Sequence, residues 1–302
     1  MKEKVLALID ALKGDDSGVE AIALYQNGEM VLEHRFIPPN ERCIHSHTKS
    51  FVATAAGIAI DEGKLSLNTR ILDLFPEYES VITDERVKKL ELKHFLKMSS
   101  GFGAGFIMQN ERRKGEGFPD YIKYLLSKPL YHEPGTQFCY SNADSHMVAC
   151  MVERAVGEPL MIYCYNKIFS KLGIVYPVWE TDPKGTPFGG SGLYLDIIDM
   201  MKLGILYLNK GKWNGEQIVS ESWVDLASQK HIETGYKEDW SKGYGYQLWT
   251  IQQKPGAYRF DGAYGQYSIV LPEENAVLAT QCSEYQEAWK MKQALLDLVI
   301  KA

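Results

Sequence analysis

No stretch of this 302-residue sequence is apolar enough to span a bilayer, which takes about 20 residues. The densest apolar stretch, Phe51–Ile60, is about half that length and fits a buried helix better. The N-terminus also lacks the apolar segment of a signal peptide, because Glu3 and Asp10 interrupt it. We therefore expect a cytoplasmic protein that does not act at a membrane.

Clusters of basic residues and closely spaced cysteine pairs are lacking as well. The formal net charge is -6, and the most basic run, residues 111–114, is flanked by acids and glycines. This pattern argues against nucleic-acid binding. The five cysteines are widely spaced and include no Cys-x-x-Cys pair, which favours reduced thiols. No cofactor is expected, and the sequence leaves the oligomeric state open.

Apolar residues make up 45% of the chain, and their spacing gives strand-like ends and a helical middle. The predicted strands are Val19–Gln26, Met30–Phe36, Tyr244–Thr250, Ala257–Phe260, Tyr267–Leu271 and Ala276–Cys282. The predicted helices are an N-terminal amphipathic helix that ends at Gly14, followed by Phe51–Asp61, Glu91–Met98, Ser145–Val156, Asp196–Asn209 and Glu287–Ile300.

This order of elements predicts an α/β (α+β) fold. Both ends of the chain would form one antiparallel sheet flanked by helices, with a helical subdomain inserted between the two halves. We expect residues 1–50 and 185–302 to form the sheet subdomain and residues 51–184 the mainly helical one. A site for a small-molecule ligand would lie at their interface.

Ser46-His47-Thr48-Lys49 is the first candidate for chemistry, just before the predicted helix Phe51–Asp61. If the helix begins near Ser46, Lys49 lies one turn later on the same side. Free N–H groups at the helix start would stabilise an oxyanion. A desolvated lysine has a lowered pKa and can take the proton of a serine. Ser-x-x-Lys occurs about once by chance in such a chain, so an N-cap serine beside a solvated lysine is the alternative.

Tyr140-Ser141-Asn142 is the second candidate. Of the Tyr-x-Asn sequences in the chain, this one lies between a turn, residues 133–136, and a predicted buried helix. A loop held in this way can point two side chains into a cleft. A neighbouring ammonium group would make the tyrosine lose its proton more readily. The alternative is a half-buried structural tyrosine.

Residues 260–266, Phe-Asp-Gly-Ala-Tyr-Gly-Gln, form the third candidate on a predicted late strand. Gly262 would let another backbone or a ligand approach closely. A strand edge beside a serine can donate a second N–H group to an oxyanion hole. Tyr264 is the aromatic residue we expect to line a substrate pocket, because it lies within this motif. A strand bend or bulge is the alternative.

The order of the three motifs resembles that of the serine β-lactamase and penicillin-binding protein superfamily. It is most similar to the class C-like branch, which includes esterases, D-amino-acid peptidases and 6-aminohexanoate-dimer hydrolase. Further similar segments are Gly57–Leu65, Met98–Gly101, Pro134–Thr136, Gly190–Leu193 and Trp213–Gly215. The resemblance extends through nearly the whole chain, and it implies an α/β sandwich with a helical subdomain.

This resemblance implies that Ser46 is the nucleophile and that Lys49 and Tyr140 share the role of general base. Asn142 would orient Lys49 or the substrate, and the backbone N–H groups of Ser46 and Ala263 would form the oxyanion hole. The implied activity is hydrolysis of a small ester or amide through an acyl-enzyme, with β-lactamase or D-amino-acid peptidase activity as an alternative. A catalytically inactive ligand-binding module on the same fold is the alternative from another class.

One position departs from the family pattern. The third motif usually begins with Lys or His, and here it begins with Phe260. Strand alternation should send the adjacent Arg259 to the opposite face. We therefore expect an uncharged subsite that favours esters or small amides over lactam substrates.

Cys43, His45 and His47 are close enough in sequence to raise the question of a metal site. A fourth ligand or a second His-x-His sequence is not evident. We therefore expect that these side chains bind no metal and instead take part in packing or hydrogen bonding. His47 is expected to lie at the rim of the cleft.

Overall fold

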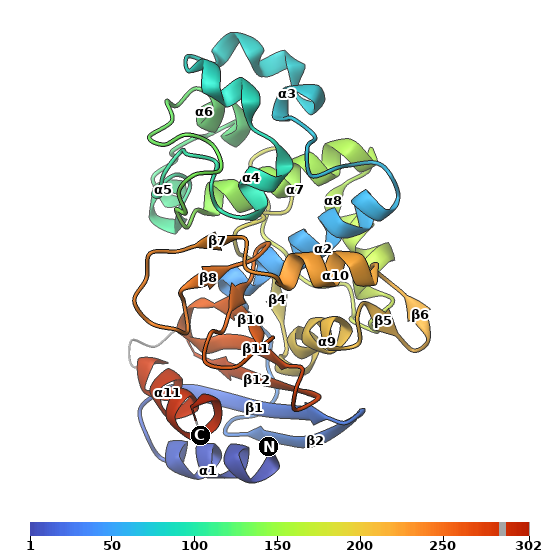
Figure 1. The fold of residues 1–302 in the computed structure, drawn as a ribbon, viewed down its shortest axis with the longest axis vertical. Helices are drawn as coiled ribbons and strands as arrows, with labels where there is room; N and C mark the ends of the chain where they lie inside the picture. Colours follow the sequence, from blue (N-terminus) through green and yellow to red (C-terminus); the bar gives the residue numbers. More distant parts are fainter. Residues whose placement is uncertain (284–287, 302) are drawn as a thin grey trace.

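The computed structural model describes residues 1–283 and 288–301, which form one large antiparallel sheet and the helices around it (Figure 1). The sheet has eight strands in the order β2-β1-β12-β11-β10-β9-β8-β7. Their bounds are β1 Val19–Gln26, β2 Glu29–Arg35, β7 Ile232–Glu233, β8 Gly243–Tyr244, β9 Trp249–Thr250, β10 Tyr258–Gly262, β11 Gln266–Leu271 and β12 Ala276–Cys282. Because β1 pairs with β12, both ends of the chain build one sheet, as the sequence predicted.

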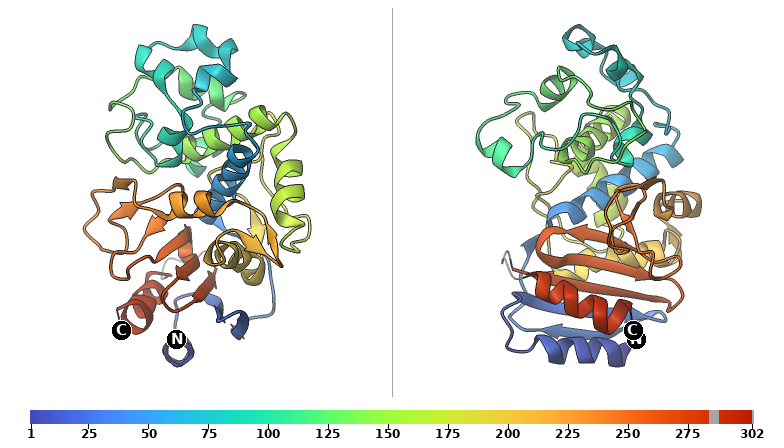
Figure 2. Two further views of the ribbon diagram at one scale, coloured as in Figure 1. Left: turned by 45° about the vertical axis from the view of Figure 1, so that its right-hand side comes forward. Right: turned by 60° about the vertical axis from the view of Figure 1, so that its left-hand side comes forward.

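Helices cover both faces of the central strands, so β11 and β12 are buried along their whole length and β1 along most of it. In β1, Ile22 and Leu24 pack with α1 (Lys2–Leu12) and α11 (Ala288–Leu295), whose side of the sheet is clear in Figure 2. The alternate residues Ala21 and Ala23 belong to the larger core that includes α9 (Ile197–Leu208). The period of two along a strand explains this division.

Most of the remaining helices lie beyond α9, on the side away from the two termini (Figure 1). They are α2 Thr48–Asp61, α3 Ile71–Leu74, α4 Leu92–Leu96, α5 Gln109–Arg113, α6 Tyr121–Leu126, α7 Asn142–Val156, α8 Leu160–Cys164 and α10 Glu221–Ser228. Helix α2 packs against α7 and is buried on all sides from Thr48 to Ala59. Small strand pairs join β3 (Arg42–Cys43) to β4 (Tyr194–Leu195) and β5 (Lys212–Trp213) to β6 (Glu216–Gln217). The predicted residue boundaries of the two subdomains stay predictions.

The predicted strand Tyr244–Thr250 is wrong, because the chain turns between β8 and β9. Gly245 N–H bonds to Leu248 O across this turn, and Gln247 has φ 59. A Cβ atom on Gly245 would lie 2.2 Å from the Ala227 carbonyl oxygen, so this close approach requires glycine.

The C-terminal helical segment reaches Ile300, as predicted, but its last turn is not α-helical. Helix α11 ends at Leu295, and a π-helical turn, Leu296–Ile300, follows it. The predicted start at Glu287 lies outside the described residues. None of the helices within the described ranges has both the length and the apolar character that crossing a membrane requires.

Candidate active site

Ser46 lies in a short turn that leads directly into α2. Residues His45–His47 form a single 3-10 turn, and α2 begins at Thr48. The left-handed φ of 47° at His45 re-aims the chain immediately before Ser46. Lys49 follows one turn later, and its Nζ lies 3.2 Å from Ser46 Oγ. The predicted Ser-x-x-Lys contact is therefore present.

The burial of α2 places the Lys49 amine inside the protein, with 1% of the residue exposed. Its Nζ donates to Asn142 Oδ1 and to the Gly190 carbonyl, each at 2.6 Å. Burial, together with the nearby Arg112 charge, lowers the pKa of Lys49 to about 7, although the Asp261 carboxylate opposes the shift. At neutral pH the amine is thus available as a base. Sequence reasoning missed the Gly190 acceptor, because a backbone carbonyl carries no side-chain signal.

Tyr140 lies just before α7, where the Ser141 side chain caps the helix by accepting from Asp144 N–H. The Tyr140 ring stacks on Trp249 with centroids 5.6 Å apart, and its centroid is 5.1 Å from Lys49 Nζ. Loss of water around the phenol raises the pKa of Tyr140, although a hydrogen bond with Ser46 opposes the shift. The expectation of a readily lost phenol proton is wrong, because desolvation outweighs the hydrogen bond with Ser46 and the charge of Arg259.

The third motif contacts the segment that carries Ser46. A Cβ atom on Gly262 would lie 2.2 Å from the Ile44 carbonyl oxygen, so only glycine lets these backbones meet. Ala263 and Tyr264 follow in a short 3-10 turn, where Tyr264 has φ 63. The Tyr264 ring packs edge-on against His45 at 5.2 Å, and 41% of Tyr264 is exposed. Tyr264 therefore lies at the surface beside His45, the residue before Ser46.

The predicted orientation of the start of this motif is wrong. Phe260 is fully buried, with ring contacts to His47 at 5.5 Å and Tyr207 at 5.0 Å. Strand alternation does separate Phe260 from Arg259 and Asp261, but these two charged residues line the cavity beside Tyr140. The subsite is therefore not an uncharged surface formed by Phe260.

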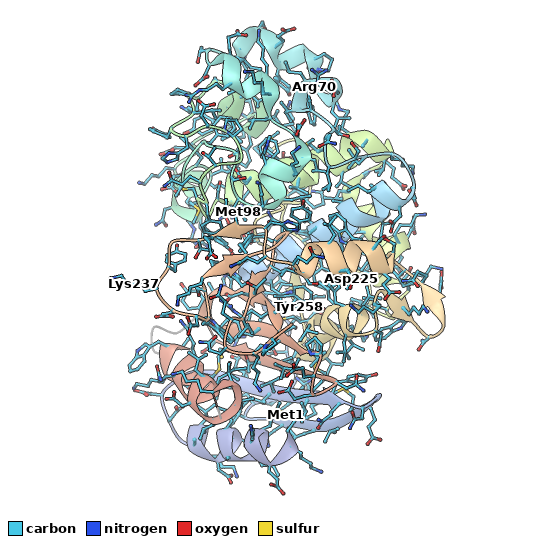
Figure 3. The ribbon with its side chains drawn as sticks, in the orientation of Figure 1. Met1, Arg70, Met98, Asp225, Lys237 and Tyr258 are labelled. Atoms are coloured by element: carbon cyan, nitrogen blue, oxygen red, sulfur yellow. The ribbon has the colours of Figure 1, made fainter. Side chains whose placement is uncertain are left out.

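This cavity has a volume of about 460 Å³ and aromatic walls that include Tyr140, Tyr236, Trp240 and Trp249. The Arg259 guanidinium lies 4.0 Å over the Trp240 ring, and its Nε donates to Asp261 Oδ2 at 2.7 Å. Lys237 lies at the edge of the cavity on the loop between β7 and β8 (Figure 3). The walls suit a flat apolar group, and the charges suit a polar end.

His47 is not a rim residue. It is completely buried, its Nε2 lies 3.0 Å from Ser268 Oγ, and burial lowers its pKa to about 3. Cys43 Sγ lies 3.9 Å from His45 Nδ1. Hydrogen bonding, the role favoured from the sequence, accounts for His47.

Another group of metal-ligand types, which the sequence did not suggest, is buried between α7 and the following loop. His146 Nε2 lies 3.2 Å from Asp182 Oδ2 and 3.5 Å from Cys150 Sγ. The Gly189 N–H donates to His146 Nδ1 at 3.4 Å, which leaves the ring proton on Nε2. A protonated Nε2 donates to Asp182 and cannot bind a metal, so this group fits a hydrogen-bonded network better.

Comparisons with known proteins show which family the chain is similar to. A model of the beta-lactamase family matches residues 14–296. The 6-aminohexanoate-dimer hydrolase of Paenarthrobacter ureafaciens is 23% identical over 288 residues, covering 87% of this chain and 72% of that protein. The N-acetylmuramyl-L-alanine amidase of Bacillus subtilis (strain 168) is 20% identical over 290 residues, covering 78% of this chain and 66% of that protein.

A solved structure supports the fold. EstCE1, described as a hydrolase with promiscuous acyltransferase activity, superposes with a TM-score of 0.79 at 17% identity. The superposition covers 99% of this chain and 98% of that chain. The similarity confirms the predicted combination of antiparallel sheet and helices.

Proposed function

The chain belongs to the beta-lactamase family, and from this premise we propose that it hydrolyses small esters or amides through an acyl-enzyme on Ser46. The observation that carries the proposal is the 3.2 Å contact between Lys49 Nζ and Ser46 Oγ. A serine hydroxyl becomes an effective nucleophile when a base in hydrogen-bond contact removes its proton. A lysine with a pKa of about 7 can serve as that base near neutral pH.

In the proposed reaction, the neutral Lys49 amine takes the Ser46 proton while Oγ attacks the substrate carbonyl carbon. The backbone N–H groups of Ser46 and Ala263 would stabilise the resulting oxyanion. The proton then passes through Lys49 and the Tyr140 phenol to the departing alcohol or amine, as the carbonyl re-forms. Water gives its proton to the same groups as it attacks the ester on Ser46. The bond to Oγ then breaks, the proton returns to Ser46 Oγ, and the acid is released. Asn142 and the Gly190 carbonyl hold the amine in place throughout.

The shape and lining of the cavity beside Tyr140 suggest that the substrate carries an aryl group. Its Tyr and Trp walls provide stacking surfaces for a flat ring. The argument against lactams from Phe260 no longer applies, because this ring lies in the core. The relatives named as hydrolases of an aminohexanoate dimer and of an acetylmuramyl-alanine bond support amides as well as esters.

A fluorophosphonate probe tests the nucleophile directly. We expect wild-type protein to gain one covalent adduct on the peptide that contains Ser46, and Ser46→Ala to gain none, as measured by intact-protein and peptide mass spectrometry. Ser50→Ala is the matched control, because Ser50 lies one turn further along α2 and its hydroxyl bonds to the Gln247 carbonyl. It should be labelled like wild type. Absence of labelling in wild type would favour an inactive ligand-binding module.

The pH dependence tests the state of Lys49. The base must be unprotonated, so kcat/KM should rise with pH through a midpoint near 7 and then reach a plateau. The midpoint lies well below the ordinary lysine pKa of 10.5, because burial disfavours the charged form. Rates for a neutral ester between about pH 5 and pH 10 would measure it. A midpoint near the ordinary lysine pKa would exclude a desolvated Lys49 as the base.

A further inference from the structure

Arg112 belongs to α5, at the left of the helical region in Figure 1, and its side chain contacts residues 180–191 of the segment that precedes β4. Its guanidinium carbon lies 3.8 Å from the centre of the Phe188 ring. Nη2 lies 3.5 Å from Ser191 Oγ, and Nη1 lies 3.7 Å from a Glu180 carboxylate oxygen. The stacking fixes the plane of the guanidinium and leaves its edges available for hydrogen bonding.

Arg112 belongs to the surroundings of the proposed catalytic amine. The Gly190 carbonyl accepts from Lys49 Nζ at 2.6 Å, and the next residue, Ser191, contacts Arg112. The Arg112 charge also lowers the pKa of Lys49, so the two side chains are within electrostatic range. Gly190 and Ser191 therefore contact both side chains.

The hydrogen-bonding capacity of Arg112 is poorly used. Arg35 bonds to both oxygens of Asp196 at 2.8 and 2.9 Å, whereas the contacts of Arg112 are all 3.5 Å or longer. Within the described residues, its buried Nε has no hydrogen-bond partner. The carboxylate of Glu180 is 46% exposed, and such pairs contribute little to stability. A half-buried guanidinium with unpaired N–H donors costs free energy of folding unless a ligand accepts hydrogen bonds from those donors.

Other cations around the site are less suited to bind an anion. Arg259 already donates to Asp261, to the Trp240 carbonyl and to Ser241. Lys237 is exposed on a surface loop, where solvent screens its charge.

We propose that Arg112 binds a carboxylate carried by the substrate, so that the preferred substrates are anionic esters or amides. The identity of the reaction rests on the proposed function, but the anion site does not. A planar, pre-oriented guanidinium suits two-point recognition of a carboxylate, which would replace the long contact with Glu180.

A matched pair of esters tests this preference. Para-nitrophenyl valerate and the mono-para-nitrophenyl ester of glutaric acid differ in a terminal methyl against a carboxylate. We expect Arg112→Gln to lower kcat/KM for the glutarate ester about 10- to 100-fold more than for the valerate ester. The ratio cancels any change in Lys49, because both esters use the same base. Arg112→Lys should restore part of the preference, since it keeps the charge without the fork.

Arg113→Gln is the control for net charge, because Arg113 is the next residue of α5 and is exposed. It should change the ratio less than twofold, well below the 10-fold expected for a lost charged contact. Equal losses for both esters in Arg112→Gln would overturn the proposal and leave Arg112 as a support for the loop at Gly190.

Calorimetry with glutarate separates this inference from the proposed reaction. The Ser46→Ala protein should bind glutarate, and the added Arg112→Gln change should weaken binding at least 10-fold, the scale of one charged hydrogen bond. If wild type hydrolyses neither ester while this loss is seen, the proposed function fails and the anion site stands. If both esters are hydrolysed but the affinity for glutarate is the same with and without Arg112→Gln, the anion site is wrong and the proposed function stands.

Discussion

Lys49→Met is expected to lower kcat for ester hydrolysis by about a thousandfold, within the range expected for loss of a general base. The amine lies in contact with Ser46 Oγ and is held there by Asn142 and the Gly190 carbonyl. Methionine keeps an unbranched side chain of similar length, so the packing of α2 is preserved while the base is removed. Steady-state kcat, measured above pH 7 where the wild-type amine is neutral, gives the effect.

The stability of this variant must be followed beside its rate. Two buried acceptors, Asn142 Oδ1 and the Gly190 carbonyl, lose their donor, which costs about 1 to 3 kcal/mol each. Lys97→Met is the matched control, because Lys97 is also partly buried and donates to the Gly135 carbonyl at 3.2 Å. The control should retain kcat within about twofold, since a change away from the reacting groups removes no base. Near-normal kcat in Lys49→Met would remove this lysine from the mechanism.

The sequence predicted the parts of the fold that local patterns determine. The first hairpin follows from two alternating runs around Asn27-Gly28, and both turn residues have the positive φ that such a turn needs, 53 and 91. The N-terminal helix buries Val5, Leu8, Ile9 and Leu12, the residues at its helical spacing. These signals are carried by residues close together in the chain.

Elements shaped by distant contacts were not predictable in the same way. The turn between β8 and β9 exists because Gln247 inserts toward α4 and α7, where its side chain bonds to the Phe95 carbonyl and to Ser145. The alternation of residues over 244–250 does not reveal these partners, because they are distant in the sequence. Alternation likewise put Phe260 and Arg259 on opposite faces, but which face borders the cavity depends on the whole sheet.

The candidate site was predicted better than its surroundings. Ser46 and Lys49 lie on one helical turn, and Tyr140 and Asn142 reach them from the start of α7, as the motif order indicated. The wrong expectation for the Tyr140 pKa arose because the sequence reveals a neighbouring amine but not the exclusion of water. Arg112 escaped notice because it lies in a run that reads as a solvated loop.

Tyr140→Phe is expected to reduce kcat for an amide or alkyl ester by about a hundredfold, while para-nitrophenyl ester hydrolysis falls less. The change removes the phenol that bonds with Ser46 and keeps the ring stacked on Trp249. The raised pKa of Tyr140 keeps its proton in place at neutral pH, so the phenol can donate to a departing group. An amine or alkoxide leaving group needs that proton, whereas para-nitrophenolate departs without it. Parallel kcat measurements on an amide and an aryl ester give the comparison.

Tyr244→Phe is the control for loss of a buried phenol. Its ring packs edge-on against Trp249 at 4.9 Å and against Tyr140 at 6.3 Å, but it has no place in the proposed proton path. It should change both rates less than about threefold, because the phenol it removes transfers no proton. If Tyr140→Phe lowers kcat equally for both substrates, this tyrosine acts in activating the nucleophile. If kcat is unchanged for both, the tyrosine serves only in packing. A fall confined to the poor leaving group distinguishes proton donation from both, because only that step depends on the basicity of the group that departs.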